Sequence, residues 1–317
     1  MPSNFALTGA SGYIAPRHLK AIKETDNRLI AAVDPHDSVG VLDGYFRDVA
    51  FFTEFERFDR HIERLRRQNS NKAVQYVSIC SPNYLHDAHA RFALRVGAHA
   101  ICEKPLVLNP WNIDALQELE QESDRNIYTV LQLRVHPALV ALREKLKTVK
   151  TKSKHNVRLT YITSRGPWYL VSWKGQPERS GGLATNIGVH FFDLLMWLFG
   201  DVQNNKVHLA TPNRVGGSIE LDNADVQWFL SIDSNDLPEV AVQKDQPTYR
   251  SITIDGEEVE FSGGFTDLHT MVYREVLSGH GFTLDDARPS IELVHDIRNA
   301  QPTGITADSH PMLRGDK

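Results

Sequence analysis

The first 34 residues combine two apolar segments with a glycine-containing turn between them. Asn4–Thr8 predicts a buried strand, Gly9–Ala15 follows directly, and Pro16–Lys23 predicts a helix. A strand, a glycine turn and a helix in this order can bind a dinucleotide pyrophosphate, because glycine lets the backbone approach the phosphates and the helix N-terminus offers unpaired N–H groups. The G-x-x-G-x-x-A spacing is one residue longer than the usual fingerprint, and alone it is weak evidence. The segment predicts the start of a parallel α/β sheet.

The second apolar segment, Arg28–Val33, ends at Asp34. An acidic residue about 20 residues beyond the glycines typically hydrogen-bonds the adenosine ribose hydroxyls. A carboxylate would repel a 2′-phosphate and no basic residue follows immediately, so NAD is favoured over NADP. The alternative role is a turn residue before Pro35. The predicted cofactor contacts here are Gly9, Ser11, Gly12, Tyr13, Ile14 and Asp34.

Strand-like and helical segments continue to alternate as far as residue 133, which indicates a parallel sheet with helical crossovers. The carboxyl ends of two predicted strands, Gln75–Cys80 and Gly97–Cys102, lead into Ser81–His86 and Glu103-Lys104-Pro105. Ligands of open α/β sheets bind at this edge. Ser81, Asn83, His86, Glu103 and Lys104 are therefore added to the predicted cofactor site. For the charged pair alone, a surface salt bridge before a turn is the competing interpretation.

The second half of the chain has strand-like segments without helices between them, which indicates an antiparallel sheet. Helices are predicted at Leu183–Phe199, Asp267–Leu277 and Asp285–Asn299, and the tail from Gln301 is expected to be loose. We predict an NAD-binding domain over residues 1–134 and a substrate-binding and oligomerisation domain over 135–317. The predicted strands are Asn156–Thr163, Val207–Ala210, Ala224–Ile232, Ser251–Ile254 and Val259–Phe261.

Composition narrows the possible partners. The formal net charge is -5 and there is no long basic block, which argues against nucleic-acid or anionic-membrane partners. Cys80 and Cys102, the two cysteines, lie in apolar segments and are expected to be buried rather than disulfide-bonded. Without a recognisable signal sequence or membrane span, the expected location is the cytoplasm.

Together, the glycine turn, Asp34, Ser81–His86 and Glu103-Lys104-Pro105 resemble the Gfo/Idh/MocA oxidoreductases. The resemblance implies an N-terminal Rossmann domain, a C-terminal α/β domain with a large, mostly antiparallel sheet, and an active-site role for Lys104. Gly181–Asp193 is similar to the family's Gly-Gly…Asp-x-Gly-x-His-x-x-Asp helix, which makes His190 a catalytic candidate. Asn186 stands where many members carry Asp, so a carboxylate–histidine dyad is in doubt here.

Longer strings resemble the branch of this family that oxidises the 3-hydroxyl of UDP-N-acetylglucosaminuronic acid for bacterial O-antigen biosynthesis. They include Ala10–His18, Tyr161–Gly166, Ser172–Gly175 and Gly264–His269. The resemblance implies NAD as cofactor and a homotetramer. Thr266 and His269, in the last string, are weaker site candidates than His190, since a helix-capping role is about as probable.

A loop rich in aromatic and cationic residues precedes the His190 segment. An arginine suits a uronate carboxylate or a diphosphate because it offers paired donors. The alternative is a loop anchored by buried tryptophans with solvated charges. The predicted substrate contacts are Lys104, Arg165, Tyr169, Trp173, Lys174, Asn186 and His190.

Oxidising a secondary alcohol requires a base to take the hydroxyl proton. We assign His190 to this role and Lys104 to binding the reacting oxygen, although the two roles could be exchanged. Another sugar or inositol dehydrogenase, an NAD-dependent glycosidase and a non-catalytic NAD-binding regulator remain alternatives. The sequence leaves open whether NADH is released or recycled in place by a second substrate such as 2-oxoglutarate. It contains no zinc-binding motif.

Overall fold

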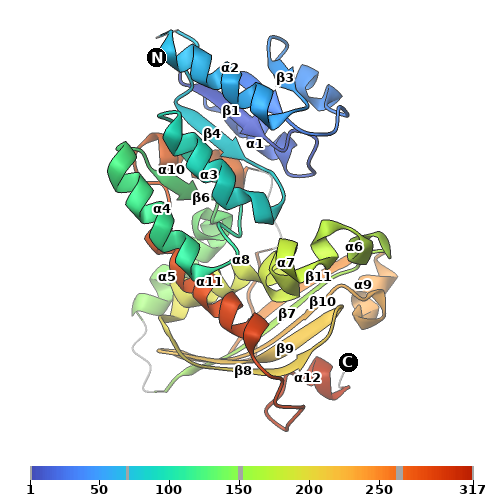
Figure 1. Cartoon of the computed structure of the whole chain (residues 1–317). Coiled ribbons are helices and arrows are strands. Elements are labelled where there is room, and N and C mark those ends of the chain that lie inside the picture. Colours follow the sequence, from blue (N-terminus) through green and yellow to red (C-terminus); the bar gives the residue numbers. More distant parts are fainter. Residues whose placement is uncertain (1, 69–70, 149–152, 262–266, 316–317) are drawn as a thin grey trace. The chain divides into compact units, whose positions relative to one another are not determined.

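The computed structural model describes residues 2–68, 71–148, 153–261 and 267–315 (Figure 1). The chain forms two compact units, Met1–Val135 with Gly264–Arg288 and His136–Gly263 with Pro289–Lys317. Each unit contains one six-stranded sheet. The predicted fold class, a parallel Rossmann sheet followed by a mostly antiparallel sheet, is confirmed. The predicted functional division at residue 134 stays a prediction.

The first sheet has the strand order β3-β2-β1-β4-β5-β6 and is parallel throughout. The order changes direction between β1 and β4, so the carboxyl ends of these strands flank the crevice where ligands of such sheets bind. The strands are β1 (Asn4–Thr8), β2 (Arg28–Val33), β3 (Ala50–Phe52), β4 (Tyr76–Ile79), β5 (His99–Cys102) and β6 (Ile127–Thr129).

Amphipathic helices cover this sheet. In α2, Phe58, Ile62 and Leu65 are buried at three- and four-residue spacing, which places one face of the helix against the sheet. Helix α10 (Leu268–Leu277) comes from far along the chain and packs against α1 within this unit, where Tyr273 joins the core. The other helices of the unit are α1 (Ala15–Glu24), α2 (Phe55–Arg67), α3 (His86–Arg95) and α4 (Pro110–Ser123).

The second sheet has the order β12-β11-β7-β10-β9-β8, and within it β7 and β10 pair in parallel. The prediction omitted β9, in which Gly216 and Gly217 interrupt the apolar pattern. A Cβ on Gly217 would lie 2.1 Å from the Lys206 carbonyl oxygen, so close strand packing requires glycine there. The strands are β7 (His155–Thr163), β8 (Val202–Ala210), β9 (Arg214–Leu221), β10 (Ala224–Ser231), β11 (Thr248–Ile254) and β12 (Glu257–Glu258). The strand predicted at Val259–Phe261 was wrong, because β12 ends before it.

Helix α8 (Val189–Phe199) packs on one face of this sheet, where Phe192 meets Trp228 edge-to-face at a centroid distance of 5.2 Å. The predicted helix Leu183–Phe199 is divided, because Ala184–Gly188 forms a π-helical turn. Among the described residues, one helical stretch, Pro177–Phe199, is long and apolar enough to cross a membrane, but 61% of its apolar window is buried. Its apolar side chains therefore serve the core of this unit.

Further helices complete the chain. Helix α5 (Pro137–Thr148) was not predicted, whereas α11 (Leu284–Asn299) confirms the last predicted helix and continues from the first unit into the second. The remaining helices of the second unit are α6 (Trp168–Val171), α7 (Pro177–Ser180), α9 (Glu239–Gln243) and α12 (Pro311–Arg314). Short 3-10 helices span Gly40–Gly44, Asn83–Leu85, Gln132–Val135, Trp173–Gly175 and Ser234–Asp236.

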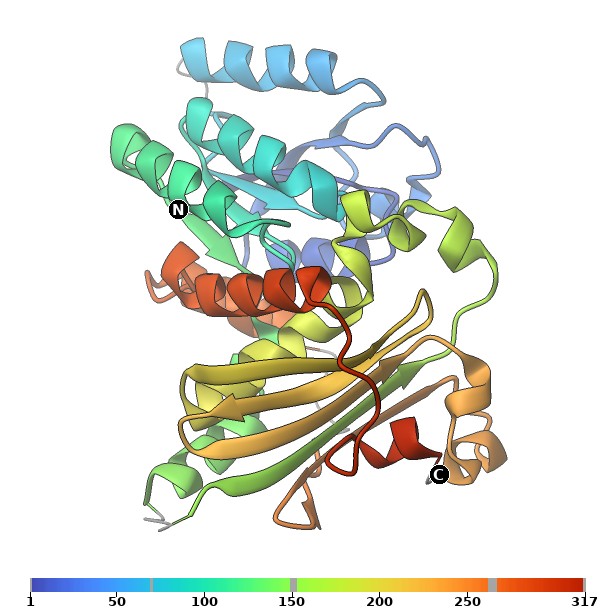
Figure 2. The ribbon, with the colours of Figure 1, turned by 60° about the horizontal axis from the view of Figure 1, so that its bottom comes forward.

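The expectation of a loose tail is wrong for residues 308–314. Figure 2 shows the C-terminal segment running across the second sheet to α12. His310 is 1% exposed, stacks on Phe229 and has Nε2 3.0 Å from Thr160 Oγ1. The tail is polar in sequence, but these contacts with the sheet hold it in place.

The burial of His310 in the tail predicts that the protein loses stability at acidic pH. Burial lowers the pKa of His310 to about 3. The unfolded chain therefore binds more protons below the ordinary histidine pKa of about 6.5, and this share of stability is lost as the pH falls from there toward 3. In urea titrations, His310→Gln should reduce the loss of unfolding free energy between pH 7.5 and pH 5 by about 2 kcal/mol.

His280→Gln, at an exposed histidine, is the control and should retain the wild-type pH dependence. Equal pH dependence in the His310 variant and the wild type would contradict the account of the tail.

Candidate active site

The glycine turn lies at the carboxyl end of β1, as predicted. Gly9 has φ +80°, and a Cβ there would lie 2.6 Å from backbone atoms of Cys80 and Ser81. The Gly9 N–H donates to the Val33 carbonyl at 2.9 Å, and the Gly12 N–H donates to the Gly9 carbonyl at 3.1 Å. Position 9 therefore requires glycine, and the turn presents bare backbone at the N-terminus of α1.

Asp34 connects this turn to the end of β2. Its two carboxylate oxygens accept hydrogen bonds from the backbone N–H groups of Ser11 (3.0 Å) and His36 (2.9 Å). Each oxygen retains a lone pair with which it can accept a ribose hydroxyl. Of the remaining predicted contacts, Tyr13 is 89% exposed and Ile14 is the N-cap residue of α1.

Ser81–His86 follows β4, as predicted, and its polar side chains are largely buried. His86 is 1% exposed, with Nδ1 2.7 Å from the Pro105 carbonyl oxygen and Nε2 2.8 Å from the Ser81 carbonyl oxygen. Ser81 Oγ lies 2.8 Å from His89 Nδ1, and Asn83 is 7% exposed. His86 therefore joins the loops that follow β4 and β5, a role that the sequence did not predict.

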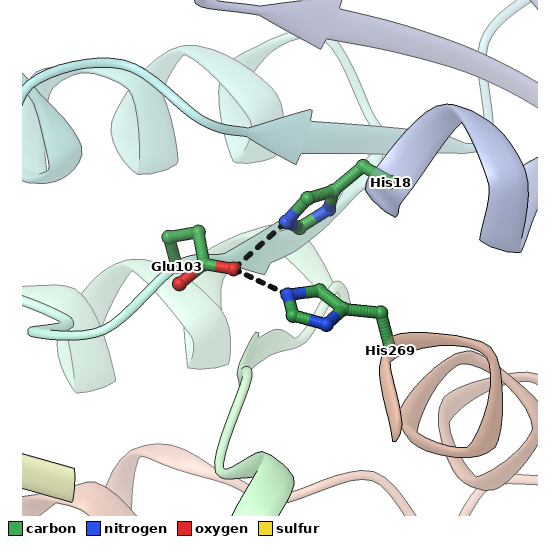
Figure 3. Close-up of side chains that lie close together, drawn as sticks. All are labelled: His18, Glu103 and His269. Atoms are coloured by element: carbon green, nitrogen blue, oxygen red, sulfur yellow. Dashed lines mark hydrogen bonds and ion pairs between the residues drawn. The ribbon is translucent and has the colours of Figure 1, made fainter. Parts of the chain in front are cut away.

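Glu103 and Lys104 follow β5. Glu103 is 6% exposed, and its Oε1 lies 2.9 Å from His18 Nε2 and 2.8 Å from His269 Nε2 (Figure 3). Burial acts to raise the pKa of Glu103, but the hydrogen bonds from the two histidines hold that pKa well below its usual range. Burial lowers the pKa of Lys104, and the Glu103 charge opposes this effect. The predicted lysine therefore lies beside a buried, ionised carboxylate.

His18 was not singled out from the sequence, and His269 was only a weak candidate. His18 faces Glu103 from α1, and His269 does so from the first turn of α10. Both lie in sequence segments that resemble one branch of the family, and this resemblance is the sequence signal that could have identified them as site residues. Their meeting depends on α10 packing against α1, which local sequence patterns do not reveal. Thr266 lies outside the described residues.

In the second unit, the predicted histidine lies near the N-terminus of α8. His190 is in the first turn of that helix rather than in its middle, because the π-helical turn precedes it. Its ring meets Tyr161 edge-on at a centroid distance of 6.0 Å. A Cβ on Gly188 would lie 2.5 Å from Leu230 Cδ1, so glycine allows this helix start to lie close to the sheet.

Several predicted substrate contacts come together near this helix. Tyr169 is 2% exposed, and its hydroxyl accepts a hydrogen bond from Asn186 Nδ2 at 2.6 Å. Lys174 Nζ lies 4.7 Å from the Trp173 ring centroid. Burial and the neighbouring charge of Arg165 lower the pKa of Lys174. The loop is anchored by the buried Tyr169 rather than by buried tryptophans, since Trp168 is 50% exposed, and it brings two cations close together.

Arg250, on β11, is a further cation that the sequence analysis missed. Its guanidinium carbon lies 5.9 Å from the Tyr161 ring centroid and 6.0 Å from the Phe191 centroid. Burial lowers its pKa. No motif surrounds Arg250 in the sequence, so only the pairing of β11 with β7 reveals its place near His190's neighbours.

Comparisons with known proteins agree with this fold. Residues 3–131 match the family model described as the Gfo/Idh/MocA oxidoreductase family, NAD-binding Rossmann fold, and residues 153–231 match its C-terminal alpha/beta domain. The inositol 2-dehydrogenase of Rhizobium meliloti is 27% identical over 63% of this chain and 56% of its own length. The matched regions span about half the length of the first curated relatives.

Two solved structures are similar over nearly the whole chain. The WlbA (WbpB) dehydrogenase from Thermus thermophilus, in complex with NAD and alpha-ketoglutarate, is 52% identical, with a TM-score of 0.93 over 98% of this chain and 99% of that one. The complex of the Thermus enzyme with NAD and UDP-GlcNAcA is 51% identical, with a TM-score of 0.92 over 97% and 98%. This chain therefore belongs to the Gfo/Idh/MocA family of NAD-dependent oxidoreductases.

Proposed function

We propose that this enzyme oxidises the 3-hydroxyl of UDP-N-acetylglucosaminuronic acid to the 3-keto sugar, as a cytoplasmic step of bacterial O-antigen sugar biosynthesis. The observation that carries the proposal is the near-complete similarity to the Thermus dehydrogenase, whose structure contains NAD and UDP-GlcNAcA. The presence of Lys104 and His190 favours an enzyme over a non-catalytic NAD-binding regulator.

The first unit offers a site that fits NAD. At Gly9 a side chain would collide with neighbouring main-chain atoms, and at Gly12 a Cβ would lie 3.1 Å from the Gly9 carbonyl oxygen, so the turn has bare backbone at both positions. Asp34 retains acceptor capacity for ribose hydroxyls, and its negative charge disfavours the additional phosphate of NADP. When bound, NAD supplies the hydride acceptor. The residues of this unit hold and orient it.

The proton must leave the 3-hydroxyl as the hydride leaves C3. In this proposal, His190 accepts the proton and Lys104 binds the same oxygen. Burial lowers the pKa of Lys104, which is the direction that a lysine acting as a base requires, so the reverse assignment is the alternative. Asn186 is committed to the Tyr169 hydroxyl and, as an amide, cannot supply a carboxylate to a histidine dyad.

The cationic loop matches the charges of the proposed substrate. A uronate carboxylate and a diphosphate are both anions that arginine and lysine recognise. Arg165 is exposed, and Lys174 is half-buried against tryptophan rings. We assign Arg165, Tyr169, Trp173 and Lys174 to substrate binding, since they lie on one loop after β7 and include two neighbouring cations.

We further propose that NADH is recycled in place by 2-oxoglutarate, which would be reduced to 2-hydroxyglutarate. The support is that the Thermus enzyme was solved with NAD and alpha-ketoglutarate together. The family resemblance also supports a homotetramer, and light scattering on the samples used below would give four times the chain mass of 35.8 kDa if this is right.

Isothermal calorimetry tests the substrate. UDP-N-acetylglucosaminuronic acid should bind in the presence of NAD, with an affinity at least about tenfold higher than that of UDP-N-acetylglucosamine, because the cationic loop pairs with the carboxylate. NADH absorbance in the same sample reports oxidation. If NAD binds and neither nucleotide sugar does, the substrate assignment is wrong, and free sugars, inositols and glycosides become the next ligands to test.

Substitution of the two proposed catalytic residues tests the mechanism. Lys104→Ala and His190→Ala should each lower kcat by about 100-fold or more, because each removes a group that contacts the reacting oxygen or its proton. Calorimetric affinity for NAD should change much less in His190→Ala than in Lys104→Ala, because Lys104 is also a predicted cofactor contact. Wild-type turnover in both variants would contradict the assignment.

A further inference from the structure

A continuous chain of buried hydrogen bonds runs through the first unit beneath Lys104. Ser78 Oγ lies 2.6 Å from the Tyr273 hydroxyl, which lies 2.7 Å from His18 Nδ1. His18 Nε2 and His269 Nε2 then converge on Glu103 Oε1 (Figure 3). All five residues are at most 6% exposed. The chain links β4, α10, α1 and the end of β5.

Chemistry fixes the direction of most of these hydrogen bonds. Glu103 is ionised and can only accept, so both histidines donate their Nε2–H groups to it. Burial lowers the pKa of His18, whose neutral ring then accepts at Nδ1 from the Tyr273 hydroxyl. Tyr273 in turn accepts from Ser78, and burial holds the pKa of its phenol well above the usual range. Every member of the network therefore has a defined partner.

We propose that His18 and His269 are positioning residues, which fix the Glu103 carboxylate so that it sets the place and the charge of Lys104. The proposal rests on the proposed function, in which Lys104 contacts the substrate. It adds residues on two helices to the determinants of that lysine's reactivity.

Two contacts connect the carboxylate to Lys104. The Lys104 backbone N–H donates to Glu103 Oε2 at 3.2 Å, so the carboxylate holds the main chain from which the lysine side chain departs. Burial favours a neutral Lys104 amine, whereas the Glu103 charge favours the ammonium form. If this charge is removed, burial acts unopposed.

Other groups that titrate or carry charge also lie around this network. The charge of Arg17 lowers the pKa of His18, and the charge of Asp87 raises the pKa of Cys102. The negative charge of Glu103 raises the pKa values of its neighbours Cys80, Cys102, His86 and Tyr273. The thiol pKa values of both cysteines are raised well above the usual range by burial, so both remain neutral at physiological pH. The Glu103 charge is the cause that raises the pKa of Lys104 against burial, and the Lys104 charge in turn lowers the pKa of His86.

Two histidines and a glutamate are also a common ligand set for zinc, and their ligand atoms lie within 4.8 Å of one another. The distances favour hydrogen bonds. Both Nε2 atoms lie 2.8–2.9 Å from the same oxygen, whereas ligands around a tetrahedral zinc at about 2.0–2.1 Å would be about 3.3 Å apart. A divalent ion here would also cancel the negative charge that Lys104 experiences.

Four variants of the full chain test the proposal. Glu103→Gln keeps the shape and removes the charge. His269→Leu removes the donor, and His269→Gln restores an N–H near the position of Nε2. His99→Gln is the control, since His99 lies at the opposite end of β5, where its Nδ1 accepts from the Asn126 N–H. Circular dichroism and thermal unfolding establish that each variant folds.

The first readout is the pKa of the Lys104 amine, measured by competitive acetylation across pH with peptide mass spectrometry. Glu103→Gln should lower this pKa by about one unit or more, since a neutral amide cannot stabilise the ammonium form. The limb of the kcat profile that depends on Lys104 should move to lower pH by the same amount. His99→Gln should leave both unchanged. An unaltered Lys104 pKa in a folded Glu103→Gln variant would overturn the proposal.

The second readout is the split between turnover and cofactor binding. His269→Leu should lower kcat about tenfold or more while KM for NAD stays within about twofold, because misplacing a reacting group costs turnover rather than cofactor affinity. His269→Gln should recover kcat to within about threefold of the wild type. Equal kcat in the two variants, or stoichiometric zinc in the wild type that is lost in His269→Leu, would overturn the positioning role.

The acetylation measurement needs no substrate, so it separates this proposal from the proposed function. A lowered Lys104 pKa in Glu103→Gln, in an enzyme that does not oxidise the nucleotide sugar, would support the network and reject the substrate. Oxidation of the nucleotide sugar by the wild type, together with an unaltered Lys104 pKa in Glu103→Gln, would support the substrate and reject the network.

Discussion

A single buried carboxylate constrains most of the first unit. Glu103 accepts hydrogen bonds from a helix that follows the glycine turn, from a helix more than 160 residues further along the chain and from the backbone of Lys104. Burying an ionised carboxylate is costly unless several donors satisfy it. The strand β5, the glycine-turn helix α1 and the distant helix α10 must therefore assemble together, and their assembly fixes the end of β5 where Lys104 begins.

In the second unit, the sheet and helix α8 form a rigid support for loops with polar and aromatic side chains. Glycines at positions 188 and 217 let α8 and the strands approach closely, and Trp228 fills the space between sheet and helix. The loop with Arg165, Tyr169 and Lys174 leaves β7, and Tyr169 is fixed by Asn186. A loop supported in this way can present its charges with little loss of conformational entropy on binding.

Much of the fold could be predicted from the sequence, because apolar periodicity and glycine turns are local signals. β1, β2 and α10 were found within one residue of their observed bounds. The missed β9 lacks a continuous apolar pattern, and the tail is held by His310, a single polar residue in a polar segment. In the site, Asp34 and Lys104 were identified by their positions at the ends of predicted strands, and His190 was identified by similarity to a family motif. Contacts that join distant segments, such as His18 with His269 or Arg250 with Tyr161, require the folded chain.

The central claim is that hydride leaves C3 of the uronate ring. The most direct measurement uses UDP-N-acetylglucosaminuronic acid with deuterium at C3, incubated with enzyme, NAD and 2-oxoglutarate and followed by mass spectrometry. The account predicts that the label moves to the nicotinamide and from there to C2 of 2-hydroxyglutarate, while the sugar product loses it. Retention of the label at C3 of a converted sugar, or transfer from a C4-labelled substrate instead, would contradict the account.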